Sequence, residues 1–310
     1  MGATYRAPPA LQARVVARTF RLAVAQSEIV EDPSDVAALR ASGARLRRLM
    51  AEARDAGARL VQFPEGAITY PHKRVMPVHG PDRVGPADWT RAAWPVLRAE
   101  AEAIAEPAGC LGIWVAFGSI HPLSDGNRPH NSLYVVSDTG NPVGRYDKRF
   151  LSNTEVRYLY SPGTEPLVFE IDGFRFGCAL CIEVNFPELF AEYERLDVDC
   201  VLVSVMVDDA ARATVAQAYG TLYSYWLGYS VPAQFAATVP AGVVAPGGRW
   251  IARAPSRAEP APAIADLELS DPDVATAVQL ARPWLRTARA GLYDDHVVHG
   301  DPRSDDRGTF

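Results

Sequence analysis

Apolar residues recur along the chain in two periods, one typical of strands and one typical of helices. Alternation of apolar and polar positions predicts half-buried strands, and apolar residues three and four positions apart predict amphipathic helices. On this basis we expect helices over 36–57, 92–106, 186–196 and 215–227. We expect strands over 20–25, 59–63, 111–119, 131–137, 143–148, 167–171, 174–180, 200–207, 233–238, 242–244 and 250–253. Helices therefore alternate with hairpins and single strands, which predicts α and β layers around mixed sheets.

Three local signals refine this picture. The sequence Asp-Thr-Gly-Asn over 138–141 lies between two alternating segments and predicts a hairpin. The segment 200–207 is nearly continuously apolar, which predicts a central strand covered on both faces. Asn185 precedes an apolar helical pattern and Glu188 follows three residues later, so we expect Asn185 to cap that helix in a capping box.

Composition and charge exclude several classes of protein. Of the 310 residues, 48% are hydrophobic and 22% are charged, which argues against a disordered chain and against a fibre. The net charge is −6 and the basic residues are dispersed, so nucleic acid is not expected as a partner. No apolar run approaches the roughly 18 residues that a membrane span needs, so we expect no membrane contact.

The chain reads as one domain with two polar ends. No internal repeat and no Ser- or Gly-rich linker divides it, so we expect a single domain over 19–298. Residues 1–18 carry three arginines, no acidic residue and two adjacent prolines, and we interpret them as a mobile N-terminal extension. Residues 299–310 contain almost no apolar side chain and are expected to form a C-terminal tail.

The cysteines favour a reducing environment. There are four, at positions 110, 178, 181 and 200, and they are too few and too unevenly spaced for a disulfide framework. We therefore expect a cytoplasmic protein. Neither a second C-x-x-C nor a histidine pair completes a tetrahedral metal site, and we expect neither a metal nor a cofactor.

Three residues with catalytic potential stand where predicted strands end: Glu65, Lys148 and Cys181. The carboxyl ends of strands line the ligand crevice in open α/β sheets, so these side chains are expected to meet. A neutral thiol needs a base to accept its proton and a cation to favour the anion before it can attack a carbonyl or nitrile carbon. Glu65 is a candidate for this base, and Lys148 is a candidate for this cation. Lys148 and the backbone N–H of Ile182 are also candidate donors to an oxyanion.

The segments around these residues resemble the nitrilase superfamily, the carbon-nitrogen hydrolases. The resemblance rests on Phe-Pro-Glu over 63–65, Tyr-Asp-Lys-Arg-Phe-Leu over 146–151 and Cys-Ile-Glu-Val-Asn-Phe-Pro-Glu-Leu over 181–189, in that order. It implies an amidase-like enzyme with the four-layer α-β-β-α sandwich of that superfamily, which doubles into an α-β-β-α-α-β-β-α stack in a homodimer. It also implies the family's catalytic roles for Glu65, Lys148 and Cys181, and a positioning role for a second glutamate, Glu155.

Two departures from the family pattern predict the substrate. Many members carry Arg where this chain has Asn185, and nitrile-directed members often carry Trp where it has Ile182. We therefore expect a small neutral amide as substrate, rather than a carboxylate-bearing amide or a nitrile. The loops over 66–78, 152–161 and 206–212 are expected to shape the pocket, with Tyr70, Ile182, Asn185 and Met206 as substrate-binding residues.

The same residues are compatible with other functions. The acyl group could pass to an amine, which makes an acyltransferase, or the substrate could be a nitrile. A non-catalytic relative could bind a metabolite, although an intact Glu-Lys-Cys set argues against it. Cys178 and Cys181 form a C-x-x-C that is also found in dithiol oxidoreductases, but residues three apart on a strand point to opposite faces.

Overall fold

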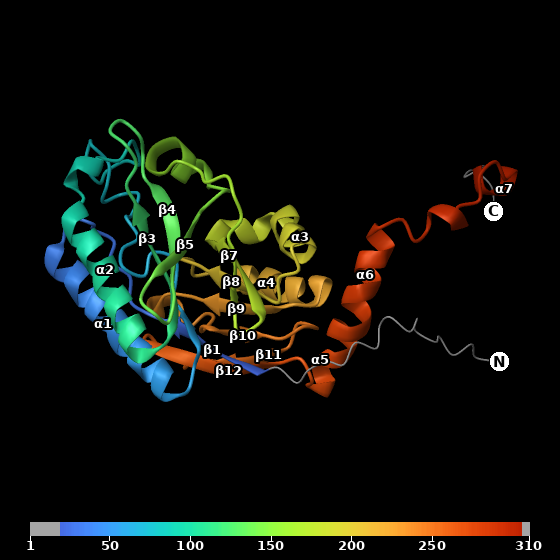
Figure 1. Ribbon diagram of the computed structural model, residues 1–310. Helices are drawn as coiled ribbons and strands as arrows, with labels where there is room; N and C mark the ends of the chain where they lie inside the picture. Colours follow the sequence, from blue (N-terminus) through green and yellow to red (C-terminus); the bar gives the residue numbers. More distant parts are fainter. Residues whose placement is uncertain (1–18, 306–310) are drawn as a thin grey trace.

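Residues 19–305, which the computed structural model describes, form two six-stranded sheets between two layers of helices (Figure 1). In spatial order the first sheet contains β12 (Ala261–Glu268), β1 (Thr19–Gln26), β2 (Leu60–Gln62), β3 (Trp114–His121), β4 (His130–Val136) and β5 (Pro142–Asp147). The second contains β11 (Trp250–Arg253), β10 (Gly242–Val244), β9 (Trp226–Ser230), β8 (Cys200–Ser204), β7 (Phe174–Leu180) and β6 (Val168–Ile171). The predicted α-β-β-α sandwich is confirmed.

The helices cover the outer faces of the two sheets. The first sheet is covered by α1 (Val36–Asp55) and α2 (Trp94–Leu111), and the second by α3 (Pro187–Arg195) and α4 (Ala210–Tyr223) (Figure 1). The short helices α5 (Pro272–Thr276), α6 (Arg282–Arg289) and α7 (Pro302–Asp305) follow the last strand and lead away from the sandwich (Figure 1). None of the described helices is long and apolar enough to cross a membrane.

Successive residues of a strand serve two different cores. In β1, Leu22 and Val24 pack into the core between the sheets, whereas Ala23 and Ala25 pack beneath α1 and α2. All four side chains are fully buried. Burial on both faces explains why the strands are apolar nearly throughout rather than alternating.

Strand direction brings the carboxyl ends of both sheets to one edge. In the first sheet β2 is parallel to β3, and β5 runs in the same direction because β4 is antiparallel to both of its neighbours. In the second sheet β7, β8 and β9 are parallel. Gln62 Nε2 donates to Ser204 Oγ at 3.1 Å, and Ser204 Oγ donates to the carbonyl of Phe63 at 2.8 Å. These buried bonds hold the ends of β2 and β8 together across the sandwich.

Several predicted boundaries in the second half are wrong. The helix expected over 215–227 is α4, which ends before Ser224 because that residue has a φ of +54°. Strand β9 begins two residues later, where aromatic residues favour a strand. The strand expected over 233–238 is only a short 3₁₀ turn, Ala233–Phe235, that follows Pro232.

Three further features differ from the sequence prediction. Asn185 does not cap α3, because Phe186 is the N-cap residue and no side chain completes the cap. Helix α2 continues through Pro107, where packing of fully buried side chains on both sides of the proline outweighs one missing N–H donor. Strand β12, which pairs antiparallel with β1, was not predicted. The extension expected over 1–18 lies outside the described residues.

Candidate active site

Cys181 stands on a strained turn at the end of β7. Its φ is +46°, and a 3₁₀ turn over Cys181–Asn185 follows directly. A left-handed conformation costs a non-glycine residue about 1–2 kcal/mol, so the surrounding structure must hold it in place. The side chain is partly exposed, and the thiol lies 3.8 Å from the carbonyl oxygen of Met206, to which it donates. The turn therefore presents the sulfur at the edge where the strands end.

A fully buried carboxylate, that of Glu183, holds this turn. Its Oε2 accepts from the N–H of Leu180 at 2.6 Å, and its Oε1 accepts from the N–H groups of Arg149 at 2.7 Å and Phe150 at 3.1 Å. The hydroxyl of Tyr146 donates to both oxygens at 2.9 Å. Burial raises the pKa of Glu183, while these donors oppose the rise. One side chain thus ties the cysteine turn to the segment that follows β5.

Lys148 lies between two carboxylates below the cysteine turn. Its Nζ donates to Glu65 Oε1 at 2.8 Å and to Glu155 Oε1 at 2.7 Å. Asn131 Nδ2 donates to the same oxygen of Glu65 at 2.9 Å, and the N–H of Ser152 donates to Glu155 Oε2 at 2.7 Å. The three charged side chains are at most 5% exposed. The structure therefore brings together Glu65 and Lys148, which the sequence singled out, and Glu155, which the resemblance implied.

The two carboxylates of this cluster differ in pKa. Burial raises the pKa of Glu65 above its ordinary value, because Lys148 and Asn131 only partly offset it. Burial acts on Glu155 too, but Lys148 and the donors of Ser152 lower its pKa below the ordinary value. Against the effect of burial, both carboxylates raise the pKa of Lys148 well above its ordinary value. Glu155 is thus the lasting counter-ion, and Glu65 is the carboxylate better able to take a proton.

The pKa of Cys181 is raised by burial and by the negative charge of Glu65. The resting sulfur is therefore a thiol, and it needs a base before it can attack. Glu65 Oε2 is buried and has no hydrogen-bond partner among the described residues, so this oxygen is free to accept a proton.

A glycine in β3 makes room for Glu65. A Cβ on Gly118 would lie 2.2 Å from the nitrogen of Gly66 and 2.5 Å from the carbonyl oxygen of Pro64. Only glycine lets the turn that carries Glu65 approach the strand so closely. The N–H of Ile68 then donates to the carbonyl of Gly118 at 3.0 Å, which fixes the turn against β3.

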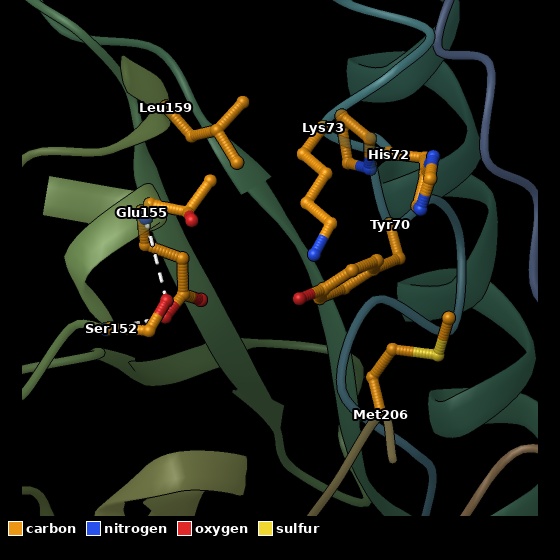
Figure 2. A pocket seen from close by; sticks show the side chains of 9 residues that line it. Tyr70, His72, Lys73, Ser152, Glu155, Leu159 and Met206 are labelled. Carbon is orange, nitrogen blue, oxygen red and sulfur yellow. Dashed lines mark hydrogen bonds between the residues drawn. The ribbon is translucent and has the colours of Figure 1, made fainter. Parts of the chain in front are cut away.

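A cavity of about 240 Å³ opens beside this cluster (Figure 2). Nine residues line it: Tyr70, Pro71, His72, Lys73, Ser152, Thr154, Glu155, Leu159 and Met206. Tyr70 and Met206, which we expected to bind substrate, are among them. Ile182 and Asn185 are not part of this lining, and Asn185 is an exposed residue that accepts a hydrogen bond from Arg212.

The other cysteines differ from Cys181 in their surroundings. All four are free thiols, and Cys178 and Cys200 are fully buried in the core of the second sheet. Burial raises the pKa of the Cys178 thiol, which makes it unreactive. Over residues 19–305, His, Cys, Asp and Glu side chains form no group of three or more that could hold a metal ion.

Glu183 lies within a segment that carries the family resemblance and Asn131 begins a predicted strand, yet neither was expected to act at the site. Each is a polar side chain in an otherwise apolar segment at one end of a strand. A buried polar side chain needs hydrogen-bond partners, and this could have identified both residues. Those partners lie 66 residues away for Asn131 and up to 37 residues away for Glu183.

Comparison with known proteins identifies a family and a common fold. Residues 21–270 match the sequence model of the family described as carbon-nitrogen hydrolase. The hydrolase Rv0480c of Mycobacterium tuberculosis is 32% identical over 193 residues, which are 59% of this chain and 60% of that protein. The chain thus spans less than two thirds of this relative's length. The 2-oxoglutaramate amidase of Bacillus subtilis is 24% identical over 94 residues, 30% of this chain and 36% of that protein.

Among solved structures, the amidase of Nesterenkonia sp. AN1 in complex with butyramide superposes with a TM-score of 0.67 and 17% identity, covering 90% of this chain and 97% of that one. The same amidase with fluoroacetamide's acetamide moiety on its active-site cysteine superposes with a TM-score of 0.66 and 18% identity, covering 87% and 96%. These similarities show a common fold.

Proposed function

The chain belongs to the carbon-nitrogen hydrolase family, and from this premise we propose that it cleaves the C–N bond of a small amide through an acyl-enzyme on Cys181. The observation that carries the proposal is the buried Glu65–Lys148–Glu155 cluster, which ends in an unpartnered oxygen of Glu65 beside the thiol turn. Together with Cys181, this cluster offers a base, a cation and a nucleophile beside the cavity that Glu155 lines.

In the first half of the reaction the sulfur of Cys181 bonds to the amide carbon while Glu65 accepts the thiol proton. The carbonyl oxygen becomes an oxyanion, and Lys148 with the N–H of Ile182 stabilises that charge. When the intermediate collapses, the C–N bond breaks and Glu65 returns the proton to the leaving nitrogen. Ammonia or an amine departs, and the acyl group stays on the sulfur as a thioester.

In the second half a water molecule takes the place of the amine. Glu65 removes a proton from the water as its oxygen bonds to the acyl carbon, and the C–S bond then breaks to release the acid and the thiol. Glu155 holds Lys148 in position through both halves, since its own charge stays paired with the ammonium. Transfer of the acyl group to an amine instead of water would use the same steps.

Relatives support a small amide as the substrate class. The Nesterenkonia amidase has been seen with butyramide bound and with an acetamide moiety on its active-site cysteine. A partial relative is a 2-oxoglutaramate amidase. The cavity of about 240 Å³ is below the usual range for drug-sized ligands, roughly 300–1,000 Å³, which favours an amide of few atoms.

Incubation with a panel of small aliphatic amides is expected to release ammonia and acid in equal amounts, with a transient acyl mass increase on Cys181. Intact-mass spectrometry after rapid quenching detects the adduct, and peptide mapping locates it. More ammonia than acid in the presence of an added amine would indicate acyl transfer. No ammonia and no adduct with any amide or nitrile would refute the proposal.

We further propose a homodimer, held in part by the C-terminal segment. Helix α3 buries its apolar side chains within its own chain, so its exposed face is mostly charged. By contrast, large apolar side chains are exposed after residue 279: Leu280, Trp284, Leu292, Tyr293, Val297 and Val298. A polar-rimmed apolar surface of this kind is typical of an interface. The free thiols suit a reducing compartment, and we propose a cytoplasmic location.

Sedimentation equilibrium at micromolar concentration is expected to give about twice the chain mass of 33.7 kDa. Replacing the 52% exposed Trp284 by Lys should weaken self-association, because a charge would replace buried interface area. Val143→Lys is the control, since Val143 is 45% exposed but lies on β5, far along the chain from the C-terminal segment. A mass of one chain for the unmodified protein contradicts the dimer.

A further inference from the structure

The cavity beside Cys181 contains one cation with no counter-ion. Lys73 lies in the loop after β2, and its side chain points into the cavity, with the amine near the hydroxyl of Tyr70 and facing Glu155 (Figure 2). It is the one Lys or Arg among the nine lining residues. Among the described residues, no carboxylate lies within ion-pair distance of Lys73 and no acceptor forms a hydrogen bond with it. Lys73 is an exposed residue, and an ammonium without a partner that reaches into a half-enclosed site is a binding group for an anion.

The one acidic residue of the lining is already engaged. Glu155 Oε1 accepts a hydrogen bond from the ammonium of Lys148, and Glu155 Oε2 accepts one from the N–H of Ser152. Glu155 and Glu65 share the charge of Lys148 at the buried end of the site, so neither is a free partner for Lys73. The cavity is therefore negative at its catalytic end and positive at the end that Lys73 occupies.

Three other cations near the site in sequence are held elsewhere, and a fourth, Arg157, does not line the cavity. Arg145 forms two hydrogen bonds with Asp147, and Arg149 pairs with Glu192 at 2.7 Å. Arg212 pairs with Asp209 at 3.5 Å and donates to Asn185. None of the three lines the cavity. Lys73 is thus the group through which the cavity can recognise a charge on the substrate.

We propose that Lys73 binds a carboxylate at the far end of the substrate, so that the preferred substrate is a short aliphatic chain with an amide at one end and a carboxylate at the other. This inference rests on the proposed amide cleavage and names its substrate class. The amide reaches Cys181 and Lys148, while the carboxylate is bound on the side of the cavity that Lys73 occupies, across from Glu155. The flexible four-carbon stem of lysine lets the ammonium follow chains of slightly different length.

This inference reverses the expectation of a neutral amide. That expectation assumed that Asn185 touches the substrate where many relatives carry Arg. The structure places Asn185 on the surface, bonded to Arg212, and a different loop supplies the cation. A lysine that follows Glu65 by eight residues had no recognisable motif, so only the shape of the loop identifies it.

Matched substrate pairs test the inference. Succinamate and butyramide have the same chain length and differ in a terminal carboxylate or methyl group, as do glutaramate and valeramide. For the unmodified protein, kcat/KM is expected to be about tenfold or more higher for the acid of at least one pair, which is the worth of one charge-assisted contact. Raising the salt concentration should narrow this ratio, because the amine is reached by solvent.

Variants of Lys73 test whether this residue causes the preference for the acid. Lys73→Gln is expected to bring the ratio within each pair to less than about threefold, and Lys73→Glu should make the neutral amide the better substrate. Arg74→Gln is the matched control: Arg74 is the adjacent exposed cation, its guanidinium bonds to the carbonyls of Pro81 and Asp82, and it does not line the cavity. This control should keep the ratio of the unmodified protein.

The outcomes separate this inference from the proposed function. If the protein cleaves butyramide as well as succinamate, or if Lys73→Gln keeps the full preference for the acid, the inference is overturned and the amidase proposal stands. If none of the four amides releases ammonia or leaves an acyl adduct on Cys181, the proposed function fails and the inference fails with it. A preference for the acid that is lost in Lys73→Gln and kept in Arg74→Gln supports it.

Discussion

Cys181→Ala is expected to reduce turnover by a factor on the order of 10⁴ or more and to abolish the acyl adduct, because the proposed mechanism forms the bond to the substrate carbon through this sulfur. The fold should persist. The N–H of Leu180 and its carboxylate partner Glu183, which hold the turn, are untouched, and alanine meets the same strain at a φ of +46° as cysteine does. The measurements are steady-state rate, intact mass after incubation with an amide, and thermal unfolding.

The matched control for this variant is Cys178→Ala. Cys178 is fully buried in β7 and belongs to the core between the sheets, so its removal should change stability modestly and leave turnover largely intact. A protein that needs both thiols, or an added dithiol, would instead be an oxidoreductase. Retained turnover in Cys181→Ala, at unchanged stability, would show that another residue is the nucleophile.

The sequence was most informative where function depends on strand ends. Glu65 and Lys148 follow strands of the first sheet and Cys181 follows a strand of the second, and the carboxyl ends of these strands lie at one edge of the sandwich. The juxtaposition of these residues could therefore be predicted before any coordinates. The apolar patterns likewise predicted α and β layers around mixed sheets, and the family resemblance implied the sandwich.

Contacts between distant segments could not be predicted from the sequence. Glu183 is an ordinary acidic residue in the sequence, and its importance comes from four donors, three of them over 146–150 and one at Leu180. Strand β12 has few strongly β-forming residues, and it is a strand because β1 offers it an antiparallel edge over eight residues. Lys73 has no periodic or motif signal at all, and its role follows from the direction of its side chain alone.

The difference in pKa between Glu65 and Glu155 also could not be predicted from the sequence, because it depends on contacts in the folded chain. Both are buried beside the same ammonium, yet the pKa of Glu65 is raised and that of Glu155 is lowered, because only Glu155 has a second donor on its other oxygen. Two identical residue types thus take different roles, one as proton acceptor and one as lasting counter-ion. This asymmetry makes the effect of removing Lys148 predictable.

Lys148→Gln is expected to lower kcat severely, by at least the roughly 10²–10³-fold that loss of one oxyanion donor costs, because the ammonium acts chiefly on charge that develops in the transition state. It should also lower the melting temperature, since two buried carboxylates lose their shared cation. Arg145→Gln is the control: it removes a cation from β5 that pairs with Asp147 outside the cavity, and it should leave kcat nearly unchanged.

The pH dependence of the residual activity distinguishes a catalytic lysine from one that only supports the fold. Glu65 must be ionised to accept the proton of the thiol, so kcat/KM falls as the pH drops through the pKa of Glu65. In the unmodified protein Lys148 lowers that pKa against the effect of burial. Removing the ammonium therefore raises it, and the acid limb of the profile should move to higher pH in Lys148→Gln, measured with butyramide because this substrate does not titrate. An unshifted acid limb, or an unchanged kcat with a raised KM, would make Lys148 a residue that binds substrate rather than one that acts on the reacting atoms.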